Sequence, residues 1–287
     1  MKRKIIKLFV AFAGILVIVS CGNKSYQKNT GKKEGFKIVS LAQSLTKELE
    51  HLGLDSSIVG ATSYCDISLR NPDLIIGTST EVNVEKILLL KPDIVVATGL
   101  TSQATIATLK NNGINIYTSP KMNSFGAICD QFATIGKLVG KEDLAKSIIA
   151  ESKKKIDSLK NSIPEGQKKQ TIFFQIGANP LFTVIPDTYM NDLISFSGCE
   201  NIASDMKKGT ITRESVLQRN PDIIFIVTMG IAGDEEKKTW ESYKELKAVG
   251  NHKIFIIDSE MACTPTVVTF TKTLGVMMNL MYNTENQ

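Results

Sequence analysis

The chain has 287 residues, of which 43% are hydrophobic and 22% charged, a composition typical of a globular protein with one large or two modest cores. Its formal net charge is +5, but the leader is basic and contains Lys2, Arg3, Lys4 and Lys7. The remainder is close to neutral and shows no basic face. Because phosphate binding requires such a face, nucleic acid is excluded as a partner.

The first twenty residues are typical of a secretory signal peptide. Residues 1–7 are basic, and residues 8–20 form an uncharged, apolar run that suits the hydrophobic segment of a signal but is too short to span a bilayer permanently. The junction of Ser20 with Cys21 resembles a bacterial lipobox, in which Cys21 would be diacylated and become the mature N-terminus. The alternative is a plain signal peptide, or a membrane anchor with an incidental cysteine.

Residues 21–36 are polar and rich in glycine and lysine, so we predict a flexible tether that takes no part in a core. Together, the signal and the tether predict a globular body that is extracytoplasmic (periplasmic) and anchored to a membrane by an N-terminal lipid.

The folded body is predicted to begin at residue 37, and residues 37–140 have the pattern of an α/β lobe. Its strands are expected at 37–42, 58–62 and 114–118, and its helices at 44–51, 103–111 and 124–138. The polar stretch 63–83 brings Tyr64, Cys65 and Asp66 to the point where the second strand should end. Because α/β folds bind ligands at the carboxyl ends of strands, these three residues are candidate ligand contacts.

Residues 141–163 are predicted to form one long helix. Apolar residues recur at helical spacing, charged residues occupy the other face, and no glycine or proline occurs before Pro164. The helix should be on the order of 30 Å long. It could be a surface element of either lobe or a rigid connector between them, and its position midway along the chain favours the connector.

Residues 164–287 have the pattern of a second α/β lobe. Strands are expected at 171–176 and 253–258, a loop at 179–182, and helices at 189–196, 240–246 and 265–282. The last helix is rich in methionine and leucine, which indicates core packing. Trp240, the only tryptophan, is also expected to pack in the core.

One pattern occurs in both halves of the chain. Residues 84–98 (VEKILLLKPDIVVAT) and 213–227 (RESVLQRNPDIIFIV) align without gaps. Each copy predicts a helix, a Pro-Asp turn and a buried strand. Glu85 and Glu214 open the two copies, at helix starts where the helix dipole favours negative charge. The repeat therefore predicts two similar lobes, and a chance similarity between two ordinary α/β units is the alternative.

The ordered set of motifs resembles the class III periplasmic binding proteins over residues 37–283. The set comprises KIVSL, VGATSYCD, NVEKILLLKPDIVVA, the long helix, IFFQIGANPLFT, TRESVLQRNPDIIFI and KIFIID. These proteins are the substrate-binding components of ABC importers for cobalamin, ferric siderophores and haem. The resemblance implies two α/β lobes with central sheets, joined by a single long backbone helix, and a ligand held in the cleft between the lobes. It implies neither catalysis nor a resident cofactor.

The resemblance also implies a partner, an ABC permease dimer with its ATPase subunits. In similar proteins one surface glutamate of each lobe pairs with arginines of the permease, and Glu85 and Glu214 fall at those positions. Charge-assisted contacts at two separate points would fix orientation as well as affinity. The alternative is that both glutamates only stabilise helix starts.

A ligand cleft needs apolar and aromatic walls with a few polar anchors. The candidate ligand contacts are Tyr64, Cys65, Asp66, Phe182, Met261 and Thr264. Tyr64 and Phe182 fall where similar cobalamin-binding proteins place aromatic contacts. The tryptophan that those proteins carry shortly before the first repeat glutamate is absent, and Ser79 stands at its position. The expected ligand is therefore a metal chelate, either a cobalamin or other corrinoid or a ferric siderophore, with haem as an alternative.

Other functions find less support in the sequence. A free metal ion is not expected, because the two histidines, His51 and His252, lie beside no other candidate ligands. The chain has no GxSxG, P-loop or His-Glu metal motif, so we do not expect an enzyme. A structural or adhesion lipoprotein is the remaining class. Up to two disulfides are compatible with the four cysteines other than Cys21, and their pairing is left open.

Overall fold

The computed structural model of the protein describes residues 35–164, 166, 168–228 and 233–282. The predicted signal peptide (1–20), the lipidation residue Cys21 and the tether up to residue 34 lie outside these residues. None of the described helices combines the length and the apolarity that crossing a bilayer requires. From Phe36 onwards the chain belongs to one compact unit, which contains two separate β-sheets.

The first sheet has four parallel strands in the order β2-β1-β3-β4. The strands are β1 (Ile38–Ser40), β2 (Ile58–Ala61), β3 (Ile94–Ala97) and β4 (Ile116–Thr118). The two central strands are buried throughout, as expected when helices cover both faces of a parallel sheet. With this sheet the first lobe contains α1 (Gln43–His51), α2 (Asp66–Arg70), α3 (Val84–Leu90), α4 (Gln103–Asn111) and α5 (Phe125–Leu138), and the short 3-10 turns η1 (Asp55–Ser57) and η2 (Pro72–Leu74).

The second sheet is parallel except for one edge strand, and its main order is β6-β5-β8-β9 with β7 also paired to β5. The strands are β5 (Thr171–Ala178), β6 (Leu181–Thr183), β7 (Glu200–Asn201), β8 (Ile223–Val227) and β9 (Ile254–Ile257). The helices of this second lobe are α7 (Tyr189–Phe196), α8 (Arg213–Arg219), α9 (Gly233–Glu241), α10 (Lys247–Gly250), α11 (Ser259–Cys263) and α12 (Val267–Tyr282). The predicted α/β fold with a central sheet in each lobe is confirmed.

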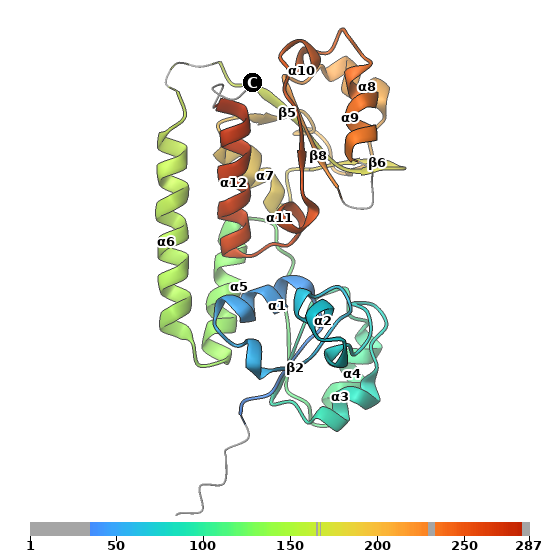
Figure 1. The fold of residues 1–287 in the computed structure, drawn as a ribbon, viewed down its shortest axis with the longest axis vertical. Helices are drawn as coiled ribbons and strands as arrows, with labels where there is room; N and C mark the ends of the chain where they lie inside the picture. The colour runs from blue at the N-terminus through green and yellow to red at the C-terminus, as the bar shows by residue number, and fades with distance from the viewer. Residues whose placement is uncertain (1–34, 165, 167, 229–232, 283–287) are drawn as a thin grey trace, which may run out of the picture. The chain divides into compact units, whose positions relative to one another are not determined.

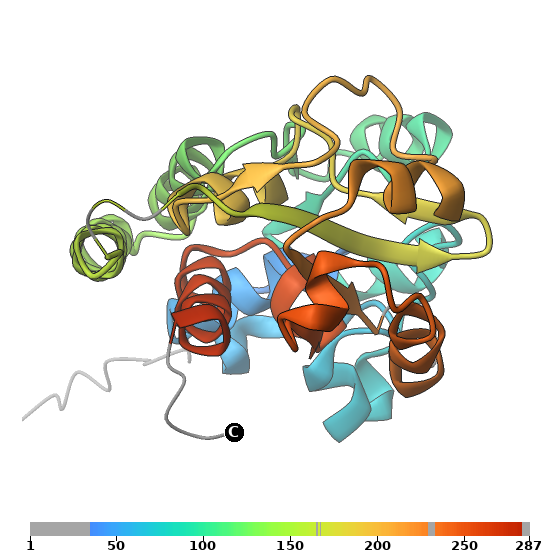
Figure 2. The same ribbon diagram turned by 90° about the horizontal axis from the view of Figure 1, so that it is seen from above.

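The long helix α6 (Glu142–Asn161) has 20 residues and lies between the two sheets in chain order. It packs against α5 of the first lobe and α12 of the second, and Figures 1 and 2 show it running beside α12. Its approach to α5 requires a glycine, because a Cβ on Gly136 would lie 2.5 Å from the Cβ of Ala145 on α6. The predicted single helix over 141–163 is confirmed with slightly narrower bounds.

Aromatic side chains form a second connection between the lobes. The ring of Phe125, the first residue of α5, lies with its centroid 4.6 Å from that of Phe270 on α12 and 6.3 Å from that of Phe196 at the end of α7. The backbone N–H of Phe125 also donates to the Asp192 carboxylate of α7 at 2.8 Å. The lobes therefore share a packed core beside α6, which limits how far one lobe can rotate against the other.

The repeated sequence produces the same local structure twice. In both copies a polar side chain caps the helix, since Asn83 accepts from the N–H of Lys86, and Thr212 accepts from the N–H of Ser215. Each helix ends in a left-handed residue directly before the proline, Lys91 (φ 49°) and Asn220 (φ 46°). The predicted order of helix, turn and buried strand is confirmed in both copies.

The aspartate of each Pro-Asp turn links its strand to the neighbouring strand. Asp93 Oδ2 accepts from the backbone N–H of Lys37 at 2.7 Å, and the N–H of Asp93 donates to the Lys37 carbonyl at 2.8 Å. Asp222 makes the same reciprocal pair with Thr171, at 2.8 and 3.0 Å. The two aspartates thus fix where each central strand begins.

Two sequence predictions in the second lobe were wrong. The helix predicted at 240–246 does not form, because Trp240 and Glu241 are the last residues of α9, which begins at Gly233 with an acidic first turn, and residues 242–246 form a turn. The loop predicted at 179–182 contains strand β6, which pairs with β5 after the cis Asn179–Pro180 bond. No disulfide forms among the described cysteines, since Cys65, Cys129, Cys199 and Cys263 are all free.

Candidate functional site

A cavity of about 540 Å³ lies at the carboxyl ends of the strands of the first sheet. Loops that follow β1, β3 and β4 form most of its wall, and the segment between α11 and α12 closes it from the second lobe. Its lining residues are Ala42, Gln43, Ser44, Tyr64, Ser79, Thr98, Gly99, Leu100, Ser119, Pro120, Lys121, Met122, Gln131, Cys263, Thr264 and Pro265. This is where parallel α/β sheets bind their ligands.

An adjoining cavity of about 390 Å³ shares Gln43, Tyr64, Cys263 and Thr264 with the first. The two cavities therefore form one cleft with walls from both lobes. A slightly larger hollow of about 570 Å³ lies between α6 and α12. No strand end reaches that hollow, so the cleft is the candidate ligand site.

The structure brings two of the predicted ligand contacts together. Tyr64 follows β2 and is 67% exposed, and Thr264 is buried between α11 and α12. Both line both cavities. Ser79, which stands where a tryptophan was expected by resemblance, also lines the larger cavity. A small hydroxyl side chain therefore occupies that part of the wall.

The other predicted contacts do not line the larger cavity. Cys65 is fully buried in the first lobe, with its Sγ 3.1 Å from Thr46 Oγ1 and 3.2 Å from Thr62 Oγ1. Met261 packs against the core of the protein. Phe182, 37% exposed on β6, packs over two glycines of the second lobe.

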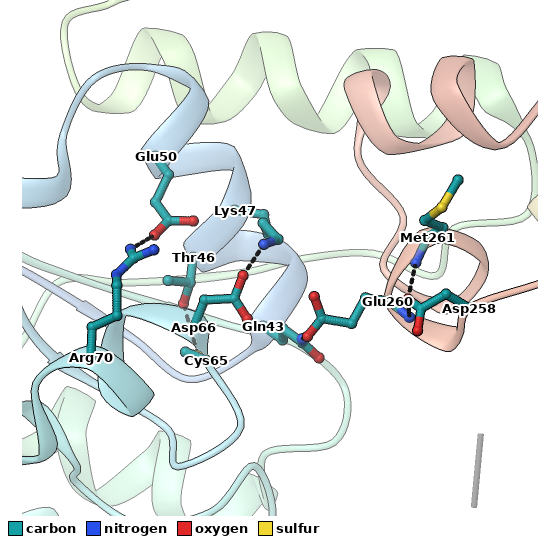
Figure 3. Close-up of polar contacts among 10 residues, drawn as sticks. All are labelled: Gln43, Thr46, Lys47, Glu50, Cys65, Asp66, Arg70, Asp258, Glu260 and Met261. Atoms are coloured by element: carbon teal, nitrogen blue, oxygen red, sulfur yellow. Dashed lines mark hydrogen bonds and ion pairs between the residues drawn. The ribbon is translucent and has the colours of Figure 1, made fainter. Parts of the chain in front are cut away.

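Asp66, the remaining candidate, belongs to a polar network (Figure 3) that includes Gln43 and Glu260, two residues that line the smaller cavity. Its carboxylate pairs with the Lys47 ammonium group, and the hydrogen bond from Lys47 holds the pKa of Asp66 below its usual range. Between the two lobes, Gln43 Nε2 on α1 donates to Glu260 Oε1 on α11 at 3.0 Å. Burial, and then the charge of Asp66, raise the pKa of Glu260. The network thus joins the lobes at one side of the cleft.

A second polar contact joins the lobes at another part of the wall. Lys121, which follows β4, pairs through Nζ with Asp187 Oδ2 of the second lobe at 2.5 Å. Both side chains are well exposed, so this pair contributes little to stability. Lys121 is therefore a cationic side chain on the cavity wall whose protein partner is held only weakly.

Sequence reasoning missed several wall residues, chiefly Ser119, Lys121, Gln131 and Glu260. Ser119 and Lys121 directly follow the predicted strand 114–118, so the rule that led to Tyr64 could have found them. Gln131 and Glu260 lie on helices, where no such rule applies. Among the described residues, no group of three or more His, Cys, Asp or Glu side chains could hold a metal ion.

A model of the periplasmic binding protein family matches residues 38–261. The chain belongs to this family. The ABC transporter substrate-binding lipoprotein YvrC of Bacillus subtilis is 30% identical to the chain over 251 residues, which cover 85% of the chain and 79% of YvrC. The vitamin B12-binding protein of Vibrio cholerae is 24% identical over 234 residues, covering 80% of the chain and 83% of that protein.

The fold of this periplasmic binding protein is found among solved structures. A possible iron-binding (periplasmic solute-binding) protein from Staphylococcus epidermidis matches it with a TM-score of 0.76 and 26% identity, covering 86% of this chain and 98% of the other. The class III architecture of two lobes joined by one long helix is thereby confirmed. The relatives are substrate-binding proteins of transport systems and not enzymes.

Proposed function

We propose that this periplasmic binding protein is a lipid-anchored, extracytoplasmic component of an ABC importer. In this proposal it captures a metal chelate, either a cobalt corrinoid or a ferric siderophore, and delivers it to the permease dimer and its ATPase subunits. The observation that carries the proposal is the cleft itself, in which strand-end loops of the first lobe meet the 263–265 segment of the second. The names of the relatives, which include B12 and iron binders, support the ligand class.

The wall chemistry fits a chelate better than a bare ion. Tyr64, Leu100 and Met122 give it aromatic and apolar surface, while Ser119 and Lys121 supply hydrogen-bond donors. Of the predicted contacts, we propose that Tyr64 and Thr264 touch the ligand at the centre of the cleft, and that Asp66 lies beside the smaller cavity. Cys65, Met261 and Phe182 stay predictions.

Haem is the second candidate, and one observation favours it. Tyr64 projects from the wall with its side chain mostly exposed, and a tyrosine is one of the side chains that hold haem iron in proteins. A haem complex would therefore show an absorption spectrum that changes in a Tyr64→Phe variant, whereas a corrinoid or siderophore complex would not need the phenol oxygen.

The proposed function is tested by a thermal-shift screen of the ligand-free protein. The ligands are cyanocobalamin, dicyanocobinamide, haemin and ferric siderophores, each compared with its metal-free form where one exists. A true ligand at a hundredfold excess over its dissociation constant should stabilise the protein by about 2.7 kcal/mol. This should raise the Tm by roughly 5–10 °C for a protein of this size. A panel without any shift would refute a chelate as the cargo and favour a structural lipoprotein.

Truncating Tyr64 should weaken binding without destabilising the protein. Because its side chain is mostly exposed, Tyr64→Ala should leave the Tm of the free protein unchanged. Loss of an aromatic anchor should weaken affinity by roughly 10- to 100-fold, as measured by titration with the ligand found in the screen. Phe36→Ala, which truncates another exposed aromatic residue, is the matched control. An unchanged affinity in Tyr64→Ala would contradict the proposed site, and Phe182→Ala tests the second predicted aromatic contact.

We further propose that α6 acts as a stiff connector between lobes of residues 37–140 and 164–287. The packing of α6 on α5 and α12, together with the rings of Phe125, Phe196 and Phe270, supports only a small closure on ligand binding. Small-angle scattering should therefore show little compaction when ligand is added.

A further inference from the structure

A buried acid lies behind the wall of the cleft. Glu48 is on α1, and its side chain is fully buried. Its Oε1 accepts from Gln131 Nε2 at 3.0 Å, while its Oε2 has no hydrogen-bond partner among the described residues. Gln131 in turn contacts the hydroxyl of Ser119 through its Oε1. Gln131 and Ser119 both line the cavity, so a chain of three polar side chains runs from the core to the ligand site.

The surroundings of Glu48 disfavour its charged form. On α1, Lys47 is paired with Asp66, and His51 lies one turn further along. From β4, Tyr117 acts on Glu48 as a neutral phenol, whose own pKa is raised by burial and then by Glu48. Burial raises the pKa of Glu48 to about 8, and the hydrogen bond from Gln131 opposes this only in part. Glu48 is therefore a neutral carboxylic acid at neutral pH.

The hydroxyl of Ser119 has two acceptors but only one proton. Its Oγ can donate to Gln131 Oε1 or to the Pro120 carbonyl, 3.0 Å away. Turning the Gln131 amide by half a turn exchanges its oxygen and nitrogen at almost the same positions. The hydroxyl then accepts from Gln131 Nε2 and donates to Pro120, so each contact has one donor and one acceptor.

We propose that Glu48 positions the hydroxyl of Ser119 through the amide of Gln131, and that the proton on Glu48 decides whether this hydroxyl offers the ligand a donor or an acceptor. When Glu48 is neutral, its O–H donates to Gln131 Oε1, and Gln131 Nε2 donates to Ser119. The Ser119 proton is then not taken by Gln131 and can turn from the Pro120 carbonyl to an acceptor atom of a ligand in the cavity. When Glu48 releases its proton to water, Gln131 Nε2 donates to the carboxylate, and Ser119 donates to Gln131 Oε1. The cavity then meets only lone pairs of Ser119.

This inference rests on the proposed ligand site, and it specifies which chemical group of the ligand meets Ser119. At neutral pH the site offers a hydroxyl donor, so the ligand group that meets Ser119 is an acceptor oxygen, such as an amide carbonyl or a hydroxamate oxygen. A ligand that takes this donor stabilises neutral Glu48, and reciprocal linkage makes its affinity depend on the Glu48 proton.

The test follows the Gln131 side-chain amide by NMR in the free protein and measures ligand affinity between pH 6.5 and 9. The probes are cyanocobalamin and a neutral ferric trihydroxamate, neither of which titrates in this range. We expect the Gln131 amide signals to move with a midpoint near pH 8 in the wild type and to stay fixed in Glu48→Gln. The affinity of the wild type should weaken by up to about tenfold as pH rises through that midpoint.

Variants separate positioning from a merely structural role. Glu48→Gln should keep an affinity near that of the wild type at pH 7, because its amide can still pair with Gln131, but its pH profile should be flat. Ser119→Ala should also flatten the profile while the Gln131 signals still titrate, which keeps the test decisive if Glu48→Gln folds poorly. Glu50→Gln, two residues further along α1 and paired with Arg70 at the surface, is the matched control and should keep the wild-type profile.

Two results would overturn the inference. One is a set of Gln131 signals that do not move with pH, or that move equally in Glu48→Gln. The other is a bound probe whose affinity has the same pH profile in the wild type and in Ser119→Ala. If neither probe binds at any pH, the proposed ligand class is wrong. The Gln131 signals of the free protein then still show whether the proton on Glu48 reorients the Gln131 amide.

Discussion

Reversing the charge of Glu85 and Glu214 together, by Glu85→Lys and Glu214→Lys, is expected to abolish ligand uptake while leaving ligand affinity intact. Both residues lie in the first turn of their helices and are exposed. Hydrogen bonds to its own backbone and to Thr212 lower the pKa of Glu214, which favours its ionised form. Both carboxylates are exposed at helix starts, and we propose that arginines of the permease pair with them there.

The expected loss of affinity for the permease follows from the loss of two charge-assisted contacts and the gain of two like-charge repulsions. Each contact should account for roughly 10- to 100-fold in affinity for the permease, so the double variant should lose on the order of 10²- to 10⁴-fold. Uptake of labelled ligand by cells and stimulation of the ATPase by purified protein provide the measurements. Normal uptake by the double variant would refute the docking role.

A matched control separates docking from helix stabilisation. Asp143→Lys with Glu235→Lys reverses two exposed acids that also lie in first turns, on α6 and α9. If the glutamates only favoured the helix dipole, both double variants would lose a similar small amount of stability and neither would lose uptake. Docking predicts that only the Glu85 and Glu214 pair affects uptake.

Truncating Trp240 to alanine is expected to lower the free energy of unfolding by about 3–5 kcal/mol. Trp240 is fully buried in the second lobe. Its ring packs against Phe173 with centroids 5.5 Å apart and lies under the Arg213 guanidinium group at 4.7 Å. Its Nε1 donates to Gln175 Oε1 at 2.7 Å. Removing the side chain therefore leaves a cavity and deprives a buried acceptor of its donor.

Urea unfolding followed by circular dichroism measures this effect, because the variant lacks the only tryptophan and cannot be followed by its fluorescence. Trp240→Phe should fall between the wild type and Trp240→Ala, since it keeps most of the apolar volume but loses the hydrogen bond to Gln175. A variant that bound ligand poorly but unfolded like the wild type would show that Trp240 serves the ligand, against its observed burial.

The repeated units were predictable because every local sequence signal in them favours the same secondary structure that the fold adopts. A capping residue, an apolar helical spacing, a Pro-Asp turn and an aliphatic strand follow in order, and the structure repeats them in both lobes. The prediction of a helix at 240–246 is wrong because Trp240 lies near the end of α9 and does not begin a helix. The acidic run at 234–236, which favours a helix start through the dipole, places the start earlier.

The site was predictable only in part, for a geometric reason. The strand-end rule locates a loop, but it does not say which way each side chain turns. Tyr64 faces the cleft while the next residue, Cys65, faces the core. The sequence does contain a signal for Glu48. It lies at helical spacing between Leu45 and Leu52, on the buried side of α1, where an acidic side chain is rare.

The free cysteines have a practical consequence for experiments on this protein. Cys65, Cys129 and Cys199 are buried, and Cys263 is partly so. Burial raises the pKa of Cys129 and Cys263 to about 11, which keeps both thiols protonated and slow to react. The described fold contains no disulfide among these four cysteines, so it does not depend on an oxidising environment for a covalent cross-link. The folded body can therefore be produced in a reducing cytosol, and in a chain without Cys21 a single cysteine introduced on its surface should take a maleimide dye selectively for distance measurements between the lobes.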